Sequence, residues 1–161
     1  MTKEILHRCE ENKKTPSHLI NLGITLFSLS EMSHTRTVLI SGGTKGIGRA
    51  IAVRFLEEGY RVHITARSID QNFAHKNLFQ HPVDMSVKEE VIAFAKKICT
   101  AEKVIDILVN NVGVFIPGSL MEEEDGCFEL QVNTNLASTY HLTRGCIQNI
   151  KNSTRPYIFN I

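Results

Sequence analysis

The chain has 161 residues, of which 42% are hydrophobic and 22% are charged, and its formal net charge is +1. A chain of this length and polarity can form one globular domain with its own core. The nearly balanced charge argues against binding to nucleic acid or to an anionic membrane, and it favours a small-molecule ligand. The cysteines lack the spacing of zinc ligands, so we expect reduced thiols, no metal site and a cytoplasmic location; they are Cys9, Cys99, Cys127 and Cys146.

Residues 1–34 are expected to form an N-terminal extension outside the fold. Their apolar run, Leu19 to Ser30, is too short to span a bilayer, and Glu10 and Glu11 precede it where a secretory leader carries positive charge. Met32 stands just before the first expected strand and is a second candidate start. We therefore place the folded domain at residues 35–161.

From Thr37 onward, short apolar segments alternate with segments of helical periodicity, which predicts a parallel sheet with helices on both faces. The expected strands are 37–41, 61–66, 77–84, 105–110 and 156–161. The first helix precedes Gly59, a typical C-terminal cap. The second begins at Ser86, with Glu89 completing a capping box. The third runs from about 124 to 150.

Each expected helix has an apolar face that predicts how it packs. The first is expected to bury Ile47, Ala50, Ile51 and Phe55. The second is expected to bury Val87, Val91, Phe94 and Ile98, and the third Leu136, Tyr140, Thr143, Ile147 and Ile150.

Three glycines, Gly42, Gly46 and Gly48, occupy the junction between the first strand and the first helix. Such a junction lets backbone N–H groups approach a phosphate at the positive end of the helix dipole. The phosphate loop of nucleotide triphosphatases does not fit, because Arg49 and Ala50 stand where it needs lysine and Ser/Thr. The G-x-G-x-x-G pattern of many dinucleotide sites does not fit either.

The segment instead resembles the short-chain dehydrogenase/reductase family, whose T-G-x-x-x-G-x-G loop lies at this junction; Ser41 replaces its threonine. The run "NNVG", 110–113, is similar to the family's N-N-A-G. Asp84 matches its strand-end aspartate, and Asn135 with Leu136 matches its N-L. The resemblance covers 37–161 and implies an α/β fold: a Rossmann-like doubly wound parallel sheet, three-layer α/β/α, incomplete on its C-terminal side. The alternative is a different α/β domain that shares these features by chance.

The resemblance also implies a dinucleotide site. An NAD site carries an acid at the end of the second strand, whereas this chain has Ala66 followed by Arg67. Arg67 can hold a 2′-phosphate, and Lys45 lies where NADP-preferring members have a basic residue, so NADP(H) is expected over NAD(H). Alternatively, both are ordinary solvated cations. The expected cofactor-binding residues are Ser41, Gly42, Thr44, Lys45, Gly46, Ile47, Gly48, Arg67, Asp84, Met85, Asn111, Val112 and Gly113.

The family's reaction is hydride transfer to or from a carbonyl or alcohol substrate, with a serine and a Tyr-x-x-x-Lys pair. The tyrosines here have Ile64, Arg144 and Ile161 four positions on, so no such pair exists. Only Asn135 carries over from the catalytic set, and it can equally be a helix asparagine bonded to backbone. We expect the N-terminal part of an NADP-dependent oxidoreductase, inactive alone, whose complete form is a homo-oligomer. The alternative is a noncatalytic nucleotide-binding or degenerate fragment.

Overall fold

Five parallel strands form the centre of residues 35–161, the part of the chain that the computed structural model describes; the expected extension, 1–34, lies outside the described residues. The strand order is β3-β2-β1-β4-β5, and every neighbouring pair is parallel. The strands are β1 (Thr37–Ile40), β2 (Arg61–Ala66), β3 (Leu78–Pro82), β4 (Ile107–Asn110) and β5 (Tyr157–Asn160).

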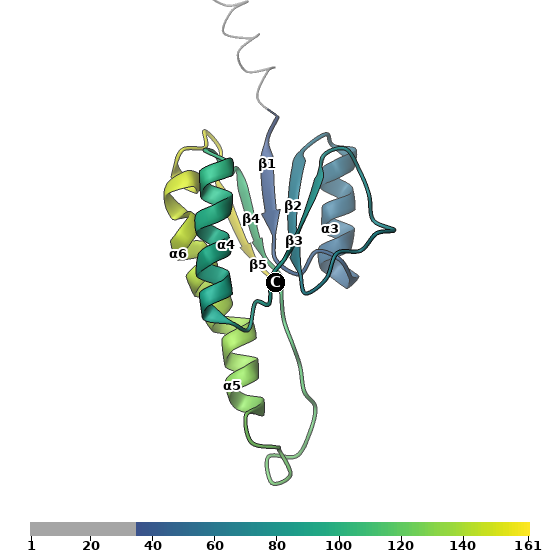
Figure 1. Ribbon diagram of the computed structural model, residues 1–161, viewed down its shortest axis with the longest axis vertical. Coiled ribbons are helices and arrows are strands. Elements are labelled where there is room, and N and C mark those ends of the chain that lie inside the picture. The colour runs from purple at the N-terminus through teal and green to yellow at the C-terminus, as the bar shows by residue number, and fades with distance from the viewer. Residues whose placement is uncertain (1–34) are drawn as a thin grey trace, which may run out of the picture. The chain divides into compact units, whose positions relative to one another are not determined.

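Helices cover both faces of this sheet (Figure 1). Helix α3, Gly46–Glu57, lies on one face, and α4, Lys88–Ala101, and α6, Ser138–Lys151, lie on the other. Helix α5, Cys127–Val132, and the π-helical turn η1, Asn133–Ala137, lead into α6 and extend past the carboxyl ends of the strands. The expected Rossmann-like three-layer α/β/α architecture is confirmed.

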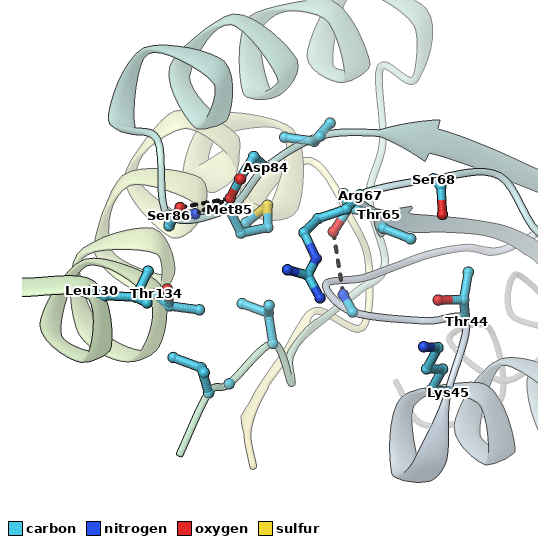
Figure 2. A pocket seen from close by; sticks show the side chains of 16 residues that line it. Thr44, Lys45, Thr65, Arg67, Ser68, Asp84, Met85, Ser86, Leu130 and Thr134 are labelled. Atoms are coloured by element: carbon cyan, nitrogen blue, oxygen red, sulfur yellow. Dashed lines mark hydrogen bonds between the residues drawn. The ribbon is translucent and has the colours of Figure 1, made fainter. Parts of the chain in front are cut away.

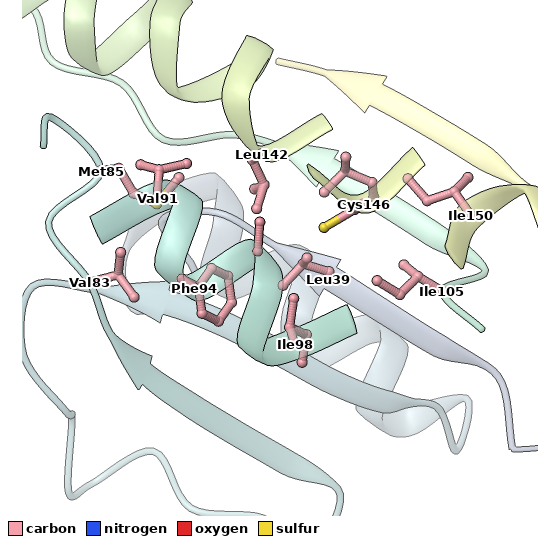
Figure 3. Packing of buried hydrophobic residues seen from close by; sticks show 12 residues of the cluster. Leu39, Val83, Met85, Val91, Phe94, Ile98, Ile105, Leu142, Cys146 and Ile150 are labelled. Carbon is pink, nitrogen blue, oxygen red and sulfur yellow. The ribbon is translucent and has the colours of Figure 1, made fainter. Parts of the chain in front are cut away.

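The core has two clusters, one on each side of the sheet. On β1, Val38 and Ile40 face α3, while Leu39 faces α4 and α6, because successive side chains of a strand point to opposite faces. Figure 3 shows the second cluster, where Phe94 of α4 and Leu142 of α6 close over the strand residues. Burying each large aliphatic side chain stabilises the fold by roughly 1.5–3 kcal/mol.

The start of α4 differs from the expected capping box. The helix begins at Lys88 after Val87, and no side chain caps it. The Ser86 hydroxyl instead donates to Asp84 Oδ1 at 2.7 Å, and Glu90 accepts the Asp84 N–H. Val87 is 38% exposed. The capping-box prediction is wrong because the Ser86 hydroxyl is turned back to donate to Asp84 and accepts no N–H of the first helical turn, and because Glu90, in place of Glu89, accepts a backbone N–H upstream of the helix.

The buried face of α6 also differs from the expected one. Its buried residues are Ser138, Leu142, Cys146 and Ile150, whereas Leu136 is 67% and Tyr140 is 55% exposed. Of the expected face, Tyr140, Thr143 and Ile147 line a groove beside β5, next to Ile158. Helix α6 is therefore apolar on two sides, and the sequence pattern does not reveal which side packs on the sheet.

The first helix packs one position away from the expected phase. Ile51 and Phe55 are partly buried as expected, but Ile47 is 62% exposed and Gly48, Ala52 and Leu56 are buried. The expected cap is present: Gly59 has φ +80°, and its N–H donates to the Leu56 carbonyl.

Candidate functional site

A cavity of about 380 Å³ opens where the carboxyl ends of the strands meet the start of α3 (Figure 2). Ligands of open parallel sheets usually bind at this carboxyl edge of the sheet. Eight of the residues expected from the sequence line it: Gly42, Thr44, Lys45, Arg67, Asp84, Met85, Val112 and Gly113.

Two cations face this cavity. Figure 2 shows the Arg67 guanidinium extending into it from the end of β2, and Lys45 beside Thr44 at the start of α3. Neither cation makes an ion pair with the residues that the structure describes. Helix α3 has no acidic residue in its first turn and no side chain capping its start. This wall of the cavity is therefore suited to an anion.

The glycines of the loop have different roles. Gly42 and Gly46 have φ of +70° and +51°, a region that side chains disfavour. Gly48 is buried, and a Cβ there would overlap the Gly42 carbonyl oxygen and the Asn111 side-chain amide. Gly48 thus allows α3 to approach both neighbours closely; neither it, Gly46 nor the exposed Ile47 lines the cavity.

Ser41 and Asn111 join the two loops behind the cavity. The Ser41 hydroxyl accepts the backbone N–H groups of Asn111 and Val112, each at 3.0 Å. The Asn111 side-chain amide donates to the carbonyls of Ser41 and Gly42 at 3.0 and 2.9 Å. Ser41 is 1% exposed and, like Asn111, is absent from the cavity lining. These contacts position the glycine loop against the loop after β4.

Asp84 lies at the far wall from Lys45 and is held as a carboxylate. The Ser86 hydroxyl and backbone N–H both donate to its Oδ1, and these bonds, with the charge of Arg67, hold the pKa of Asp84 below its ordinary value. Its Oδ2 accepts no hydrogen bond from the residues that the structure describes. That oxygen can accept a ligand N–H.

Asn135 lies in η1 and is bound to the loop after β4. Its Nδ2 donates to the Val114 carbonyl and its Oδ1 accepts the Val114 N–H, both at 2.8 Å. The structure therefore gives it the backbone-bonding role that the sequence left as an alternative. Asn135 does not line the cavity, but Thr134 beside it does.

Eight further lining residues were not expected from the sequence: Thr65, Ala66, Ser68, Val83, Ser86, Val114, Leu130 and Thr134. Thr65 has a signal, since it lies in the last two residues of β2, just before Ala66 and Arg67. Its Oγ1 accepts the Gly42 N–H at 3.2 Å. Leu130 has no such signal in the sequence, because only the tertiary fold brings α5 to the carboxyl edge of the sheet. Among residues 35–161, no three His, Cys, Asp or Glu side chains gather to hold a metal ion.

Taken together, Lys45 lies at the start of α3 on one side of the cavity and Asp84 lies at the opposite wall. Arg67 extends between them, and its charge helps to lower the pKa of Asp84. The cavity can bind an elongated anionic ligand that also carries a hydrogen-bond donor.

Comparison with known proteins shows which family this chain is similar to. The sequence profile described as short chain dehydrogenase matches residues 36–161. The 3-oxoacyl-[acyl-carrier-protein] reductase FabG of Staphylococcus aureus (strain N315) is 29% identical over 126 residues, which cover 73% of this chain and 50% of that protein.

Solved structures are similar as well. ElxO with NADP bound has a TM-score of 0.69 and 29% identity, over 79% of this chain and 55% of that one. The 3-ketoacyl-(acyl-carrier-protein) reductase from Brucella melitensis complexed with NADH has a TM-score of 0.70 and 27% identity, over 78% of this chain and 56% of that one. This chain spans about half the length of the relatives it matches. None of the helices between residues 35 and 161 has the length and hydropathy needed to cross a membrane.

Proposed function

Because the chain belongs to the short chain dehydrogenase family, we propose that its cavity binds NADP(H) for an oxidoreductase acting on a small carbonyl or alcohol. The observation that carries the proposal is that two cations, Lys45 and Arg67, line the cavity without ion-pair partners among residues 35–161.

The residues present fit such a nucleotide. The start of α3 is free of acidic side chains and caps, and it would hold the pyrophosphate. Arg67 and Lys45 would hold the 2′-phosphate, and the ionised Asp84 would accept an adenine N–H. A bound nicotinamide supplies a hydride donor or acceptor.

The preference for NADP(H) rests on residues of this chain, because the similar structures were solved with either NADP or NADH. Ala66 occupies the place where an NAD site has its acid, so no carboxylate there repels a 2′-phosphate. A charge-assisted contact of this kind contributes about 1.5–3 kcal/mol, or roughly tenfold to a hundredfold in affinity.

A second candidate function is nucleotide binding without turnover by these 161 residues. The observation that favours it is the absence of any tyrosine with a lysine four residues on, the spacing that would place both groups on one helix face. The first proposal also includes three properties of the whole protein. These are hydride transfer, a small carbonyl or alcohol substrate, and assembly into a homo-oligomer.

The experiment is a fluorescence titration of the full chain with NADPH and NADH. We expect NADPH to bind at least tenfold more tightly, and Arg67→Asp to remove that preference while changing NADH affinity little. Lys76→Asp is the control, since this exposed lysine precedes β3, at the opposite end of the sheet from the cavity. Equal affinities for the two nucleotides, or equal losses in both variants, would contradict the assignment.

Turnover is measured separately, by NADPH oxidation with a panel of aldehydes and ketones. Binding without oxidation is expected from the 161-residue chain. Steady oxidation would contradict the second candidate and leave the nucleotide site intact.

A further inference from the structure

A second cavity, about 650 Å³ in volume, lies between α4 and α6 and shares no lining residue with the first. Its walls come from the outer sides of the two helices. The residues that line it are Ile92, Ala95, Lys96, Cys99, Thr100, Lys103, His141, Arg144 and Gly145.

The charged side chains of this second cavity are all cations. Lys96, Lys103 and Arg144 line it, and no carboxylate from the described part of the chain does. None of the three forms an ion pair with the described part of the chain; the Arg144 guanidinium donates to the Tyr140 hydroxyl at 3.3 Å. Three uncompensated cations around one concave surface attract anions and repel cations.

Cys99 brings a thiol to this basic cavity. It is half-buried, and in its protonated form its Sγ donates a hydrogen bond to the Gly145 carbonyl on α6 at 3.6 Å. The neighbouring Cys146 thiol holds the pKa of Cys99 below its ordinary value. A larger thiolate fraction makes Cys99 a better nucleophile near neutral pH.

Cys146 has the opposite character. It is 0% exposed, and the neighbouring Cys99 thiol together with burial raises the pKa of Cys146. It stays protonated and out of reach of a ligand in the cavity. Cys99 is therefore the accessible thiol of the pair, and Cys146 is the buried, protonated one.

We propose that Cys99 is a covalent modification site, at which an anionic small-molecule disulfide binds in the basic cavity and forms a mixed disulfide with this thiol. The Cys99 thiolate, having released its proton to solvent, attacks one sulfur of the ligand disulfide. The ligand S–S bond breaks, a bond between Cys99 Sγ and that sulfur forms, and the other half leaves as a thiolate with the electron pair. Cys99 is oxidised and the released half is reduced.

The test compares disulfides of different charge on the full chain carrying Cys9→Ser and Cys127→Ser. The probes are 5,5′-dithiobis(2-nitrobenzoate), which is anionic, 4,4′-dithiodipyridine, which is neutral, and cystamine, which is cationic. Each rate is divided by the rate of the same probe with free cysteine, which removes the probe's intrinsic reactivity. We expect the normalised rate to be highest for the anionic probe and lowest for cystamine.

Charge variants then locate the effect. Replacing Lys96, Lys103 and Arg144 together by Gln should lower the normalised rate of the anionic probe roughly tenfold and leave the neutral probe unchanged. The matched control replaces three exposed lysines outside the cavity, Lys76, Lys88 and Lys151, by Gln. It changes net charge equally and should have a much smaller effect.

Mass mapping after treatment with glutathione disulfide completes the test. One glutathionyl group on Cys99, absent from the Cys99→Ser variant, supports the proposal. Three results would overturn it. The first is a normalised rate that does not depend on probe charge, and the second is an equal effect of the cavity triple variant and the control triple variant. The third is a Cys99–Cys146 disulfide in place of the adduct.

Discussion

Gly48 lies where α3, the glycine loop and the loop after β4 meet. A Cβ at this position would overlap the Gly42 carbonyl oxygen and the Asn111 amide, whose hydrogen bonds join the two loops. We expect Gly48→Ala to lower the free energy of unfolding by about 2–4 kcal/mol, from overpacking and from the loss of those bonds. Urea denaturation of the full chain measures this.

Gly46→Ala is the matched control for Gly48→Ala. Gly46 has φ +51° but no atom within 4 Å of an added Cβ, so its cost should come from backbone strain alone, about 1 kcal/mol. If both variants lose the same stability, close packing at Gly48 is not the cause. The sequence predicted a phosphate-contacting Gly48, and the structure gives a packing reason for the same small residue.

His81 makes stability depend on pH. Burial, then the charges of His63 and Lys97, lower the pKa of His81 to about 4, whereas an unfolded histidine titrates near 6.5. Above pH 6.5 the ring is neutral in both states; below it, the unfolded chain takes up a proton that the folded chain excludes. The neutral His81 ring therefore makes its full contribution to the free energy of unfolding above pH 6.5, and this contribution is lost as the pH falls toward 4.

When the pH is lowered from 7 to 4.5, we expect the titration of His81 to reduce the free energy of unfolding by about 1–2 kcal/mol, a range that allows for screening by solvent. His63, 3.0 Å away through its Nδ1, has its pKa lowered mainly by burial and acts in the same direction. Urea denaturation at the two pH values should show a smaller decrease for His81→Gln than for the unchanged chain. His75→Gln, at an exposed histidine, should keep the full decrease; an unchanged decrease in His81→Gln would contradict the assignment.

At the scale of elements, the strands could be predicted from sequence because the inner ones are short, mostly apolar segments that are buried along their length, even though β2 carries the polar His63 and Thr65 on one face. The bounds of β2 match the expected 61–66, since every residue of 62–65 is buried and the signal does not depend on phase. Helices require a phase as well as a location. For α6 that phase could not be read from the sequence, because a second apolar side lies along the groove beside β5. The π-helical turn η1 also changes the helical phase just before α6.

The contact between η1 and the loop after β4 depends on Asn135. We expect Asn135→Ala to loosen that loop, because both hydrogen bonds to the Val114 backbone are lost. Hydrogen exchange at the Val114 amide should accelerate at least tenfold. Asn133→Ala, at an exposed asparagine of the same turn, should leave this exchange unchanged. Similar protection in both variants would show that the loop is held by other contacts.

At the scale of the whole molecule, the candidate site was predictable where its residues are close in sequence to a strand end. Gly42 to Lys45, Arg67, Asp84 and Val112 all follow strands directly, so one local pattern finds each. Leu130 and Thr134 reach the cavity only because α5 and η1 fold back over the carboxyl edge of the sheet. No local pattern encodes that approach, and the second cavity, between α4 and α6, depends on tertiary packing in the same way.

The open edge of the sheet leads to the last prediction. Among the strands of residues 35–161, β5 is outermost and pairs only with β4, and its residues are exposed, including Ile158 at 39% and Phe159 at 46%. Unpaired backbone groups beside apolar side chains are a template for pairing with another strand. We therefore expect residues 1–161 to self-associate as concentration rises, which sedimentation velocity over a concentration series would measure.

The variant Phe159→Lys should suppress this association, because a charge on an edge strand opposes pairing, while its exposed position spares the fold. Phe115→Lys is the matched control: Phe115 is 81% exposed but follows β4, in the loop before α5, so the same loss of an exposed aromatic ring should leave association unchanged. Equal suppression by both variants would assign the association to general surface hydrophobicity. A monomer at every concentration would show that the β5 edge does not pair, whatever its exposure.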